Sequence, residues 1–322
     1  MGAPEFCYVV LAHEPVGIAR LVSRIRELSP RSSVVVRYEQ GRGFDADELH
    51  RIGAATLVSS IPVKWGAWTL TEAMLEAFAA ARERTRADYL VMISGQDYPI
   101  RDLQRWESEV VGRVPDALLA PIAEHRDDWR YRWSFVTPPL PRHPQVQRVA
   151  RHLGWQLGRV TRPVLQILPR FAGGDRRWSI GLARPWVRTP DAMPIVKASQ
   201  WMVLSGRAVD RMLALHRDRP ELARFFRTVR ISDESYVQSV LSAQADLRVE
   251  HTRTTSAYFP PETPSPVWLD EDVLTMLSER DGAPFARKLA PDASPAVVAA
   301  ADRLVENDRA AAAPDEGSPT CP

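Results

Sequence analysis

Cysteine is scarce in this sequence: the 322 residues include only two, Cys7 in an apolar run and Cys321 near the end. Two such residues predict neither a disulfide framework nor a zinc site. No apolar run reaches the roughly 18 residues that a membrane-spanning helix needs, and the first residues lack the pattern of a signal peptide. We therefore expect a protein of a reducing compartment, located in the cytoplasm.

An excess of charge of one sign is also missing. The formal net charge is +2, so no global field favours binding to nucleic acid. No established nucleic-acid-binding motif occurs either, and we expect no partner of that kind. Lysine is rare: only Lys64, Lys197 and Lys288 occur, and arginine supplies the other basic side chains. We therefore consider a functional role for each of the three lysines.

Phosphate-binding glycine loops are absent, since the sequence has neither Gly-x-Gly-x-x-Gly nor a phosphate-loop motif. Strands and helices nevertheless alternate in the first hundred residues. Apolar runs predict strands at 6–12, 33–38, 56–58 and 89–93, and helical spacing predicts helices at 16–28 and 70–84. This order predicts an α/β fold with a mostly parallel central sheet flanked by helices.

The run at 89–93 ends in the most informative motif, Ser94-Gly95-Gln96-Asp97-Tyr98-Pro99. In open α/β sheets the carboxyl ends of the strands are where ligands bind. The motif resembles the signature of the core-2/I-branching glycosyltransferases, a family that includes peptide O-xylosyltransferases. Further matches follow in the family's order: Leu11-Ala12-His13, Lys64-Trp65-Gly66, Ser199-Gln200-Trp201, Asp233-Glu234-Ser235 and Phe285-Ala286-Arg287-Lys288.

This resemblance implies a fold of the nucleotide-diphospho-sugar-transferase (GT-A) type and an inverting glycosyl transfer without a metal or other cofactor. It implies UDP-N-acetylglucosamine as donor, with UDP-xylose as the alternative, and a hydroxyl of a glycan, peptide or small molecule as acceptor. We expect one domain over 1–305, with a nucleotide-sugar-binding half at 1–100 and an acceptor and catalytic half at 101–305. A non-catalytic carbohydrate-binding protein on the same fold is the alternative from another class.

Glycosyl transfer needs a base for the acceptor hydroxyl. Asp233-Glu234 precedes the apolar pattern of a helix expected over 232–243, for which Ser232 is a suitable N-cap. Acids in a first turn often do no more than complement the helix dipole. The resemblance assigns the base to Glu234 and leaves Asp233 a supporting role.

The departing diphosphate needs positive charge. Two Asp-x-Asp strings, at 45–47 and 270–272, could hold a metal ion, but both open predicted helices and we interpret them as caps. The resemblance instead assigns the diphosphate to Lys288, with Arg287 beside it. Arg253 is a second basic candidate only by elimination.

Other matched positions predict the rest of the site. The resemblance puts His13, Trp65, Glu72 and Asp97 on the donor, although His13 can equally satisfy its loop, Trp65 can be packing and Asp97 can merely organise its turn. Gln200 and Trp201 are expected at the acceptor, where an aromatic face suits a sugar ring. A core position for Trp201 is the competing interpretation.

Two segments remain. Residues 145–162 form a basic amphipathic pattern, which we interpret as the solvated face of a helix; peripheral contact with an anionic membrane surface or an acidic acceptor is the alternative. Residues 306–322 lack periodicity, and we expect a disordered tail there.

Overall fold

The computed structural model describes residues 4–121, 129–136, 164–172, 175–184, 189–261, 263, 265–280 and 282–311. Its largest sheet contains β1 (Phe6–Leu11), β2 (Ser33–Glu39), β3 (Ala54–Ser59), β4 (Tyr89–Ser94), β6 (Ala117–Pro121), β10 (Ala198–Ser205) and β11 (Val249–Glu250). The strand order is β11-β6-β10-β4-β1-β2-β3, and β10 alone in this sheet runs antiparallel to its neighbours. The predicted class, α/β with a mostly parallel sheet, is confirmed.

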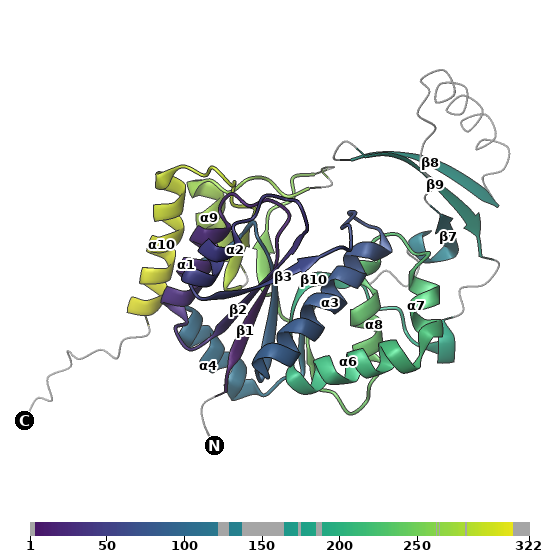
Figure 1. Cartoon of the computed structure of the whole chain (residues 1–322), viewed down its shortest axis with the longest axis horizontal. Helices are drawn as coiled ribbons and strands as arrows, with labels where there is room; N and C mark the ends of the chain where they lie inside the picture. The colour runs from purple at the N-terminus through teal and green to yellow at the C-terminus, as the bar shows by residue number, and fades with distance from the viewer. Residues whose placement is uncertain are drawn as a thin grey trace, which may run out of the picture.

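Helices cover both faces of this sheet (Figure 1). One face carries α1 (Ile18–Leu28), α2 (Ala46–Arg51), α4 (Leu103–Arg113), α9 (Glu271–Ser278) and α10 (Pro295–Ala310). The other carries α3 (Trp68–Thr85), α6 (Gly206–Asp218), α7 (Pro220–Phe226) and α8 (Tyr236–Ser242). Alternate residues of β1 enter the two cores, since Tyr8 and Val10 pack on one side and Cys7 and Val9 on the other. A sheet buried on both faces explains why the strands are nearly continuous apolar runs.

A smaller sheet joins distant segments at the carboxyl end of β4. Its strands are β12 (Thr255–Ala257), β13 (Phe285–Arg287) and β5 (Asp97–Pro99), in the order β12-β13-β5. The antiparallel pairing of β13 with β5 sets Arg287 opposite Asp97. This pairing brings the end of the predicted domain to the motif that follows β4.

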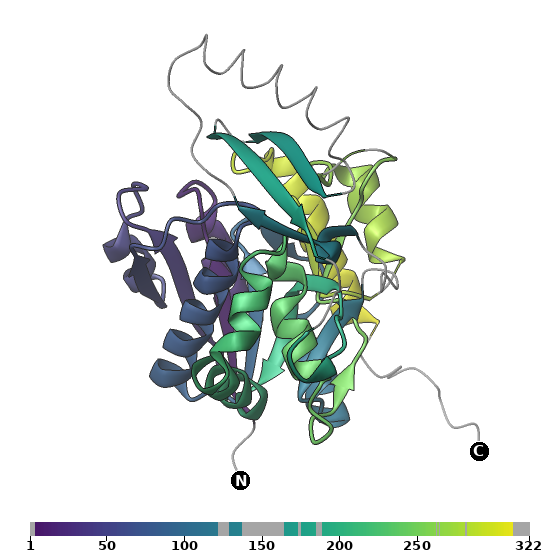
Figure 2. The same cartoon turned by 90° about the vertical axis from the view of Figure 1, so that its right-hand side faces the viewer.

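A third sheet lies at the periphery, as both Figure 1 and Figure 2 show. It contains β7 (Trp133–Val136), β8 (Leu165–Ala172) and β9 (Asp175–Ala183) in the order β7-β9-β8. Phe135 N donates a hydrogen bond of 2.8 Å to Thr228 O, which ties β7 to the segment after α7. Two short 3-10 turns, η1 (Trp129–Arg132) and η2 (Pro190–Ala192), flank this region in the sequence. The predicted basic helix at 145–162 lies outside the described residues.

Two local expectations are corrected. Residues 306–310, predicted to begin a disordered tail, continue α10 to Ala310. The helix expected over 232–243 is divided into η3 (Ser232–Glu234) and α8. Ser232 is not an N-cap, because Ile231 precedes the turn in the left-handed region at φ 58° and the Ser232 hydroxyl instead meets Thr71 Oγ1 at 2.9 Å.

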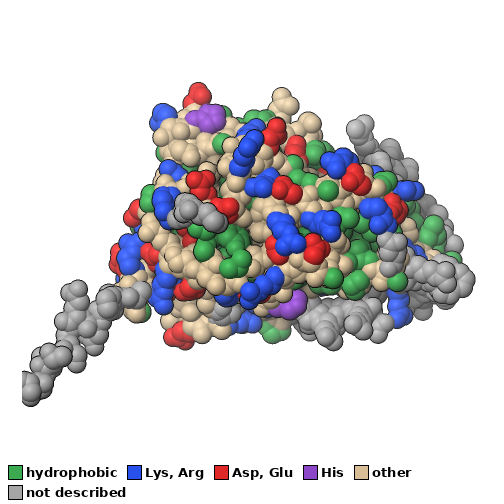
Figure 3. Space-filling view, turned by 90° about the horizontal axis from the view of Figure 1, so that it is seen from below, with side chains coloured by type: hydrophobic (Ala, Val, Ile, Leu, Met, Phe, Trp, Pro, Cys, Tyr) green, Lys and Arg blue, Asp and Glu red, His purple; other side chains and the backbone are tan. Residues whose placement is uncertain are grey.

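No helix in the described ranges is both long and apolar enough to cross a membrane. On the face shown in Figure 3, basic and acidic side chains are interspersed.

Candidate active site

The carboxyl-end edge of the central sheet gathers most of the predicted site residues. His13 follows β1, Asp97 begins β5 just after β4, and Arg287 ends β13. Because β10 runs antiparallel to β4, its first residues, including Gln200, lie at this same edge. Residues from four distant parts of the sequence therefore meet where parallel strands end.

Asp97 is buried and performs two tasks. Its Oδ2 accepts a hydrogen bond of 2.8 Å from Ser94 N, which organises the turn after β4. Its Oδ1 lies 3.5 Å from Nε of Arg287. Burial raises the pKa of Asp97 to about 6, and the Arg287 charge and the Ser94 hydrogen bond oppose that shift. The carboxylate thus anchors the turn and a cation together.

Arg287 joins the motif that follows β4 to strand β10. Its guanidinium carbon lies 4.6 Å from the ring centroid of Trp201 in β10, a cation–π geometry. Burial lowers the pKa of Arg287, and Asp97 opposes this shift. Trp201 is itself buried, at 7% exposure. This surrounding favours the packing interpretation of Trp201 over an open face for a sugar ring.

Lys288 is held by groups that the sequence analysis did not single out. Its Nζ donates a hydrogen bond of 2.6 Å to Ser265 Oγ, and it lies 5.6 Å from the ring centroid of Trp268. Partial burial lowers the pKa of Lys288, and the charge of Arg287 adds to that shift. Trp268 is half exposed. In the sequence, the tryptophan at 268, close after a proline-rich stretch, was the one feature that could have indicated these neighbours of Lys288.

His13 lies in the electrostatic field of the same cations. Its pKa is lowered by burial first; Glu14, 3.6 Å away, raises it, and Arg42, Arg287 and Lys288 lower it further. Three basic side chains therefore act on His13 at this edge, against one nearby acid. Arg42, in the loop after β2, was not among the site residues predicted from the sequence.

Glu234 ends η3 and faces a lysine from another segment. Lys197 Nζ lies 3.9 Å from Glu234 Oε2, and the two side chains are 10% and 29% exposed. Ile231 N donates a hydrogen bond of 3.0 Å to the carbonyl of Gly66, so the turn with Glu234 adjoins the Lys64-Trp65-Gly66 motif. Lys197 was not predicted as a site residue.

Asp233 is buried and lies beside Glu234 in η3. Its backbone carbonyl accepts a hydrogen bond of 3.0 Å from Nε2 of Gln238, and the same amide donates to the carbonyl of Ser199 at 3.0 Å. Gln238 is fully buried. This buried side chain fastens the Asp233-Glu234 turn to the start of β10.

Three other predicted residues lie less centrally. Glu72 on α3 accepts a hydrogen bond of 2.7 Å from Trp68 Nε1 and lies 3.5 Å from Arg227 Nη2. Trp65 is half exposed, next to the glycine that contacts the Glu234 turn. Arg253 is exposed, in the segment between β11 and β12.

Both Asp-x-Asp strings are helix caps, as predicted. Asp45 Oδ1 accepts a hydrogen bond of 2.9 Å from Glu48 N at the start of α2. Asp270 Oδ1 accepts one of 2.8 Å from Val273 N at the start of α9. Among the described residues, no three His, Cys, Asp or Glu side chains gather as a metal ion would require.

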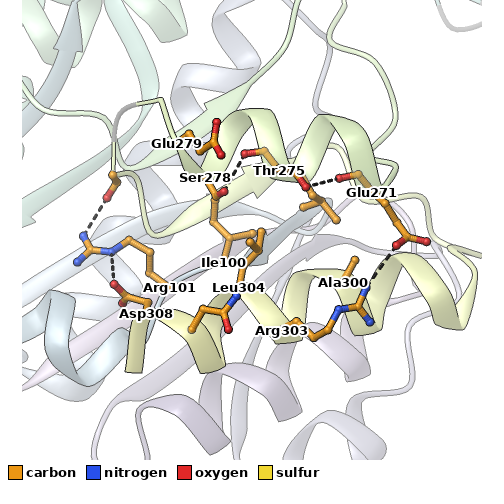
Figure 4. Close-up of a pocket in the computed structure, with 13 residues that line it drawn as sticks. Ile100, Arg101, Glu271, Thr275, Ser278, Glu279, Ala300, Arg303, Leu304 and Asp308 are labelled. Atoms are coloured by element: carbon orange, nitrogen blue, oxygen red, sulfur yellow. Dashed lines mark hydrogen bonds and ion pairs between the residues drawn. The ribbon is translucent and has the colours of Figure 1, made fainter. Parts of the chain in front are cut away.

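A groove of about 690 Å³ lies elsewhere, between α9, α10 and the residues just before α4 (Figure 4). Four of its charged side chains form two pairs: Arg303 lies 3.3 Å from Glu271, and Arg101 lies 3.4 Å from Asp308. None of the predicted site residues lines it. We therefore locate the candidate active site at the sheet edge rather than in this groove.

The chain resembles two solved structures weakly. A mycobacterial protein is 14% identical with a TM-score of 0.31, over 67% of this chain and 62% of that one. Mouse xyloside xylosyltransferase 1 in its apo form is 9% identical with a TM-score of 0.37, over 90% of this chain and 100% of that one. No curated protein matches the chain significantly.

A family model gives the decisive match. The model of the core-2/I-branching enzymes covers residues 8–262, which include His13, Asp97 and Glu234. The match ends before Arg287 and Lys288, so it does not bear on those two. Because it spans well over half of the chain, the protein belongs to the core-2/I-branching enzyme family and is a glycosyltransferase.

Proposed function

We propose that this glycosyltransferase moves N-acetylglucosamine from UDP-N-acetylglucosamine to a hydroxyl of a glycan or other acceptor, with inversion and without a metal ion. One observation carries the proposal: the start of β10 links a carboxylate turn to a cationic pair. Ser199 is bound to the turn of Glu234 through Gln238, and Trp201 supports Arg287. Transfer of xylose from UDP-xylose fits the same features and is the alternative.

Glu234 acts as the base in this proposal. Its carboxylate accepts the proton of the acceptor hydroxyl as the oxygen attacks the anomeric carbon from the face opposite the diphosphate. The bond from that carbon to the diphosphate oxygen breaks in the same step, and its electron pair leaves with UDP. Inversion follows from attack opposite the leaving group. Its partial exposure gives the Glu234 carboxylate access to a bound substrate.

Arg287 and Lys288 balance the charge of the leaving diphosphate. Cations that are already positioned in a water-poor site stabilise developing charge without reorganisation during the reaction. Arg287 is positioned by Asp97 and Trp201, and Lys288 by Ser265 and Trp268. The pKa of Lys288 is lowered, but the ordinary value for lysine is so high that the ammonium form dominates at neutral pH.

Substitutions at two positions test the proposal together. Glu234→Gln keeps the shape of the side chain and removes the proton acceptor, so turnover should fall by roughly 10²–10⁴ with nearly unchanged donor binding. Lys288→Ala should weaken UDP binding and reduce turnover, and Lys288→Arg should restore only part, because a planar fork does not replace a compact charge. Transfer rates and calorimetric UDP affinities measure both effects.

Wild-type turnover by Glu234→Gln would refute the assigned base. UDP binding by Lys288→Ala as tight as that of the wild type would move the diphosphate to Arg287 or Arg253. A panel of nucleotide sugars identifies the donor, because a donor at a hundredfold excess over its dissociation constant should stabilise the fold by about 2.7 kcal/mol. Donor hydrolysis without an acceptor separates an enzyme from a carbohydrate-binding protein.

A further inference from the structure

Lys197 lies where a charged side chain has direct influence on the proposed base. Its Nζ is 3.9 Å from Glu234 Oε2, and only 10% of its side chain is exposed. The position precedes β10 immediately. The sequence motifs do not link Lys197 to the diphosphate. Its charge contacts the Glu234 carboxylate instead.

The backbone around Lys197 is fixed on both sides by α8. Before it, Val196 N donates to Ser239 Oγ at 2.9 Å. After it, the Ser199 carbonyl accepts from Gln238 at 3.0 Å. Gln238 and Ser239 are fully buried. Because Gln238 also holds the Asp233 carbonyl, one helix sets the position of both the lysine and the Glu234 turn.

Two features of Glu234 disfavour an ionised carboxylate. Its side chain is more than two-thirds buried, and the residue before it in the same turn, Asp233, is also an acid. Burial and a like charge both disfavour a carboxylate, whereas an ammonium within about 4–6 Å favours it. The helix α3 contacts this turn through Thr71 and carries Glu72, which pairs with Arg227. Arg230, which precedes the turn in the sequence, has its guanidinium 5.7 Å from the ring of Phe135. Tyr236, which begins α8, is neutral because burial raises its pKa well above neutrality.

We propose that Lys197 is a positioning residue that keeps Glu234 ionised and oriented for proton transfer from the acceptor. This inference rests on the proposed function, because it takes Glu234 as the base. Lys197 touches no reacting atom in this role. Its effect therefore belongs to the turnover number and its pH dependence, and donor binding is expected to be independent of it.

The test compares pH profiles of the turnover number for the wild type, Lys197→Met and Lys197→Arg. Lys197→Met should move the acidic limb of the profile upward by about one pH unit, so turnover should fall by up to about tenfold on that limb, with most of the loss recovered at higher pH. Lys197→Arg, which retains the charge, should keep the limb near its wild-type position. Arg211 lies on α6 and forms an exposed ion pair with Asp246. Arg211→Met is the matched control, and it should change neither the turnover number nor the position of the acidic limb.

Calorimetric UDP affinity serves as the readout of an intact fold, and it should be unchanged in Lys197→Met; Lys197→Gln takes its place if the methionine variant does not fold. The inference is overturned if the acidic limb of Lys197→Met or Lys197→Gln lies where the wild-type limb lies. It is also overturned if Lys197→Arg shifts the limb as far as Lys197→Met does. Glu234→Gln is measured in parallel. If it is inactive while the neutral variants keep the wild-type limb, this inference alone fails; if it turns over normally, the assigned base fails too.

Discussion

At the scale of single residues, Asp97 is under two opposing influences. Burial favours its neutral form and raises its pKa to about 6, while Arg287 favours the carboxylate. Above that pH, Asp97 is an anion that balances Arg287. Below it, the buried guanidinium loses its counter-charge. The anchoring of Arg287 therefore depends on pH in the mildly acidic range.

Asp97→Asn should reveal this dependence in the stability of the fold. Between about pH 4 and pH 6, Asp97 binds more protons in the folded state than in the unfolded state, so its contribution to the free energy of unfolding falls as pH rises through this window. The upward shift of the pKa corresponds to about 3 kcal/mol. An asparagine does not titrate, so the advantage of wild type over variant should shrink by that order between pH 4 and pH 6.5 and then stay constant. Urea unfolding at several pH values measures it, and parallel pH curves would contradict the prediction.

At the scale of elements, Asp308 is one of the residues that attach α10 near its end. Asp308 accepts hydrogen bonds from Asp102 N at 3.0 Å and from Arg105 Nη1 at 3.1 Å, and it also pairs with Arg101. Figure 4 shows Asp308 and Arg101 side by side at the groove. These bonds fasten the last turn of α10 to the start of α4. They help to hold residues 306–310 in the helix, although those residues lack an apolar periodicity.

Asp308→Ala should therefore destabilise the protein by about 1–3 kcal/mol, because it leaves the Asp102 backbone N–H without its acceptor and removes a carboxylate that Arg101 and Arg105 share. Glu306→Ala, an exposed acid on the same helix, is the control and should stay within about 0.5 kcal/mol of the wild type. Denaturant midpoints measure both. Equal effects of the two substitutions would show that the attachment of α10 does not depend on Asp308.

At the scale of the whole molecule, local patterns predicted the strands at 89–93 and 33–38 within one residue at each end, because buried parallel strands are continuous apolar runs. The junctions between distant segments were not predictable. The approach of Lys197 to Glu234 depends on two side chains of α8, and the missing N-cap at Ser232 depends on the backbone of Ile231. The Asp97–Arg287 pair required the pairing of β5 with β13, which no local pattern encodes.

The enzyme as a whole should work without a divalent ion. Activity should persist in excess chelator, because basic side chains serve the diphosphate in the proposed mechanism. Joint replacement of Asp45→Asn and Asp47→Asn should leave transfer largely intact, since asparagine also caps helices well. Transfer rates with and without chelator test this. A loss that manganese or magnesium restores would refute the metal-free mechanism.

The pairing of β5 with β13 also has a consequence for the order of assembly during synthesis. Strands β1 to β4 lie early in the chain and can pair while later segments are still being made, since domains form as synthesis proceeds from the N-terminus. Arg287 reaches Asp97 only after the long stretch of chain between them has been made and folded. Contacts between residues so far apart in the sequence form slowly. In a nascent chain, Asp97 would thus be present before Arg287, its partner in the finished fold, has been made. Competence for transfer should appear late, when β13 docks.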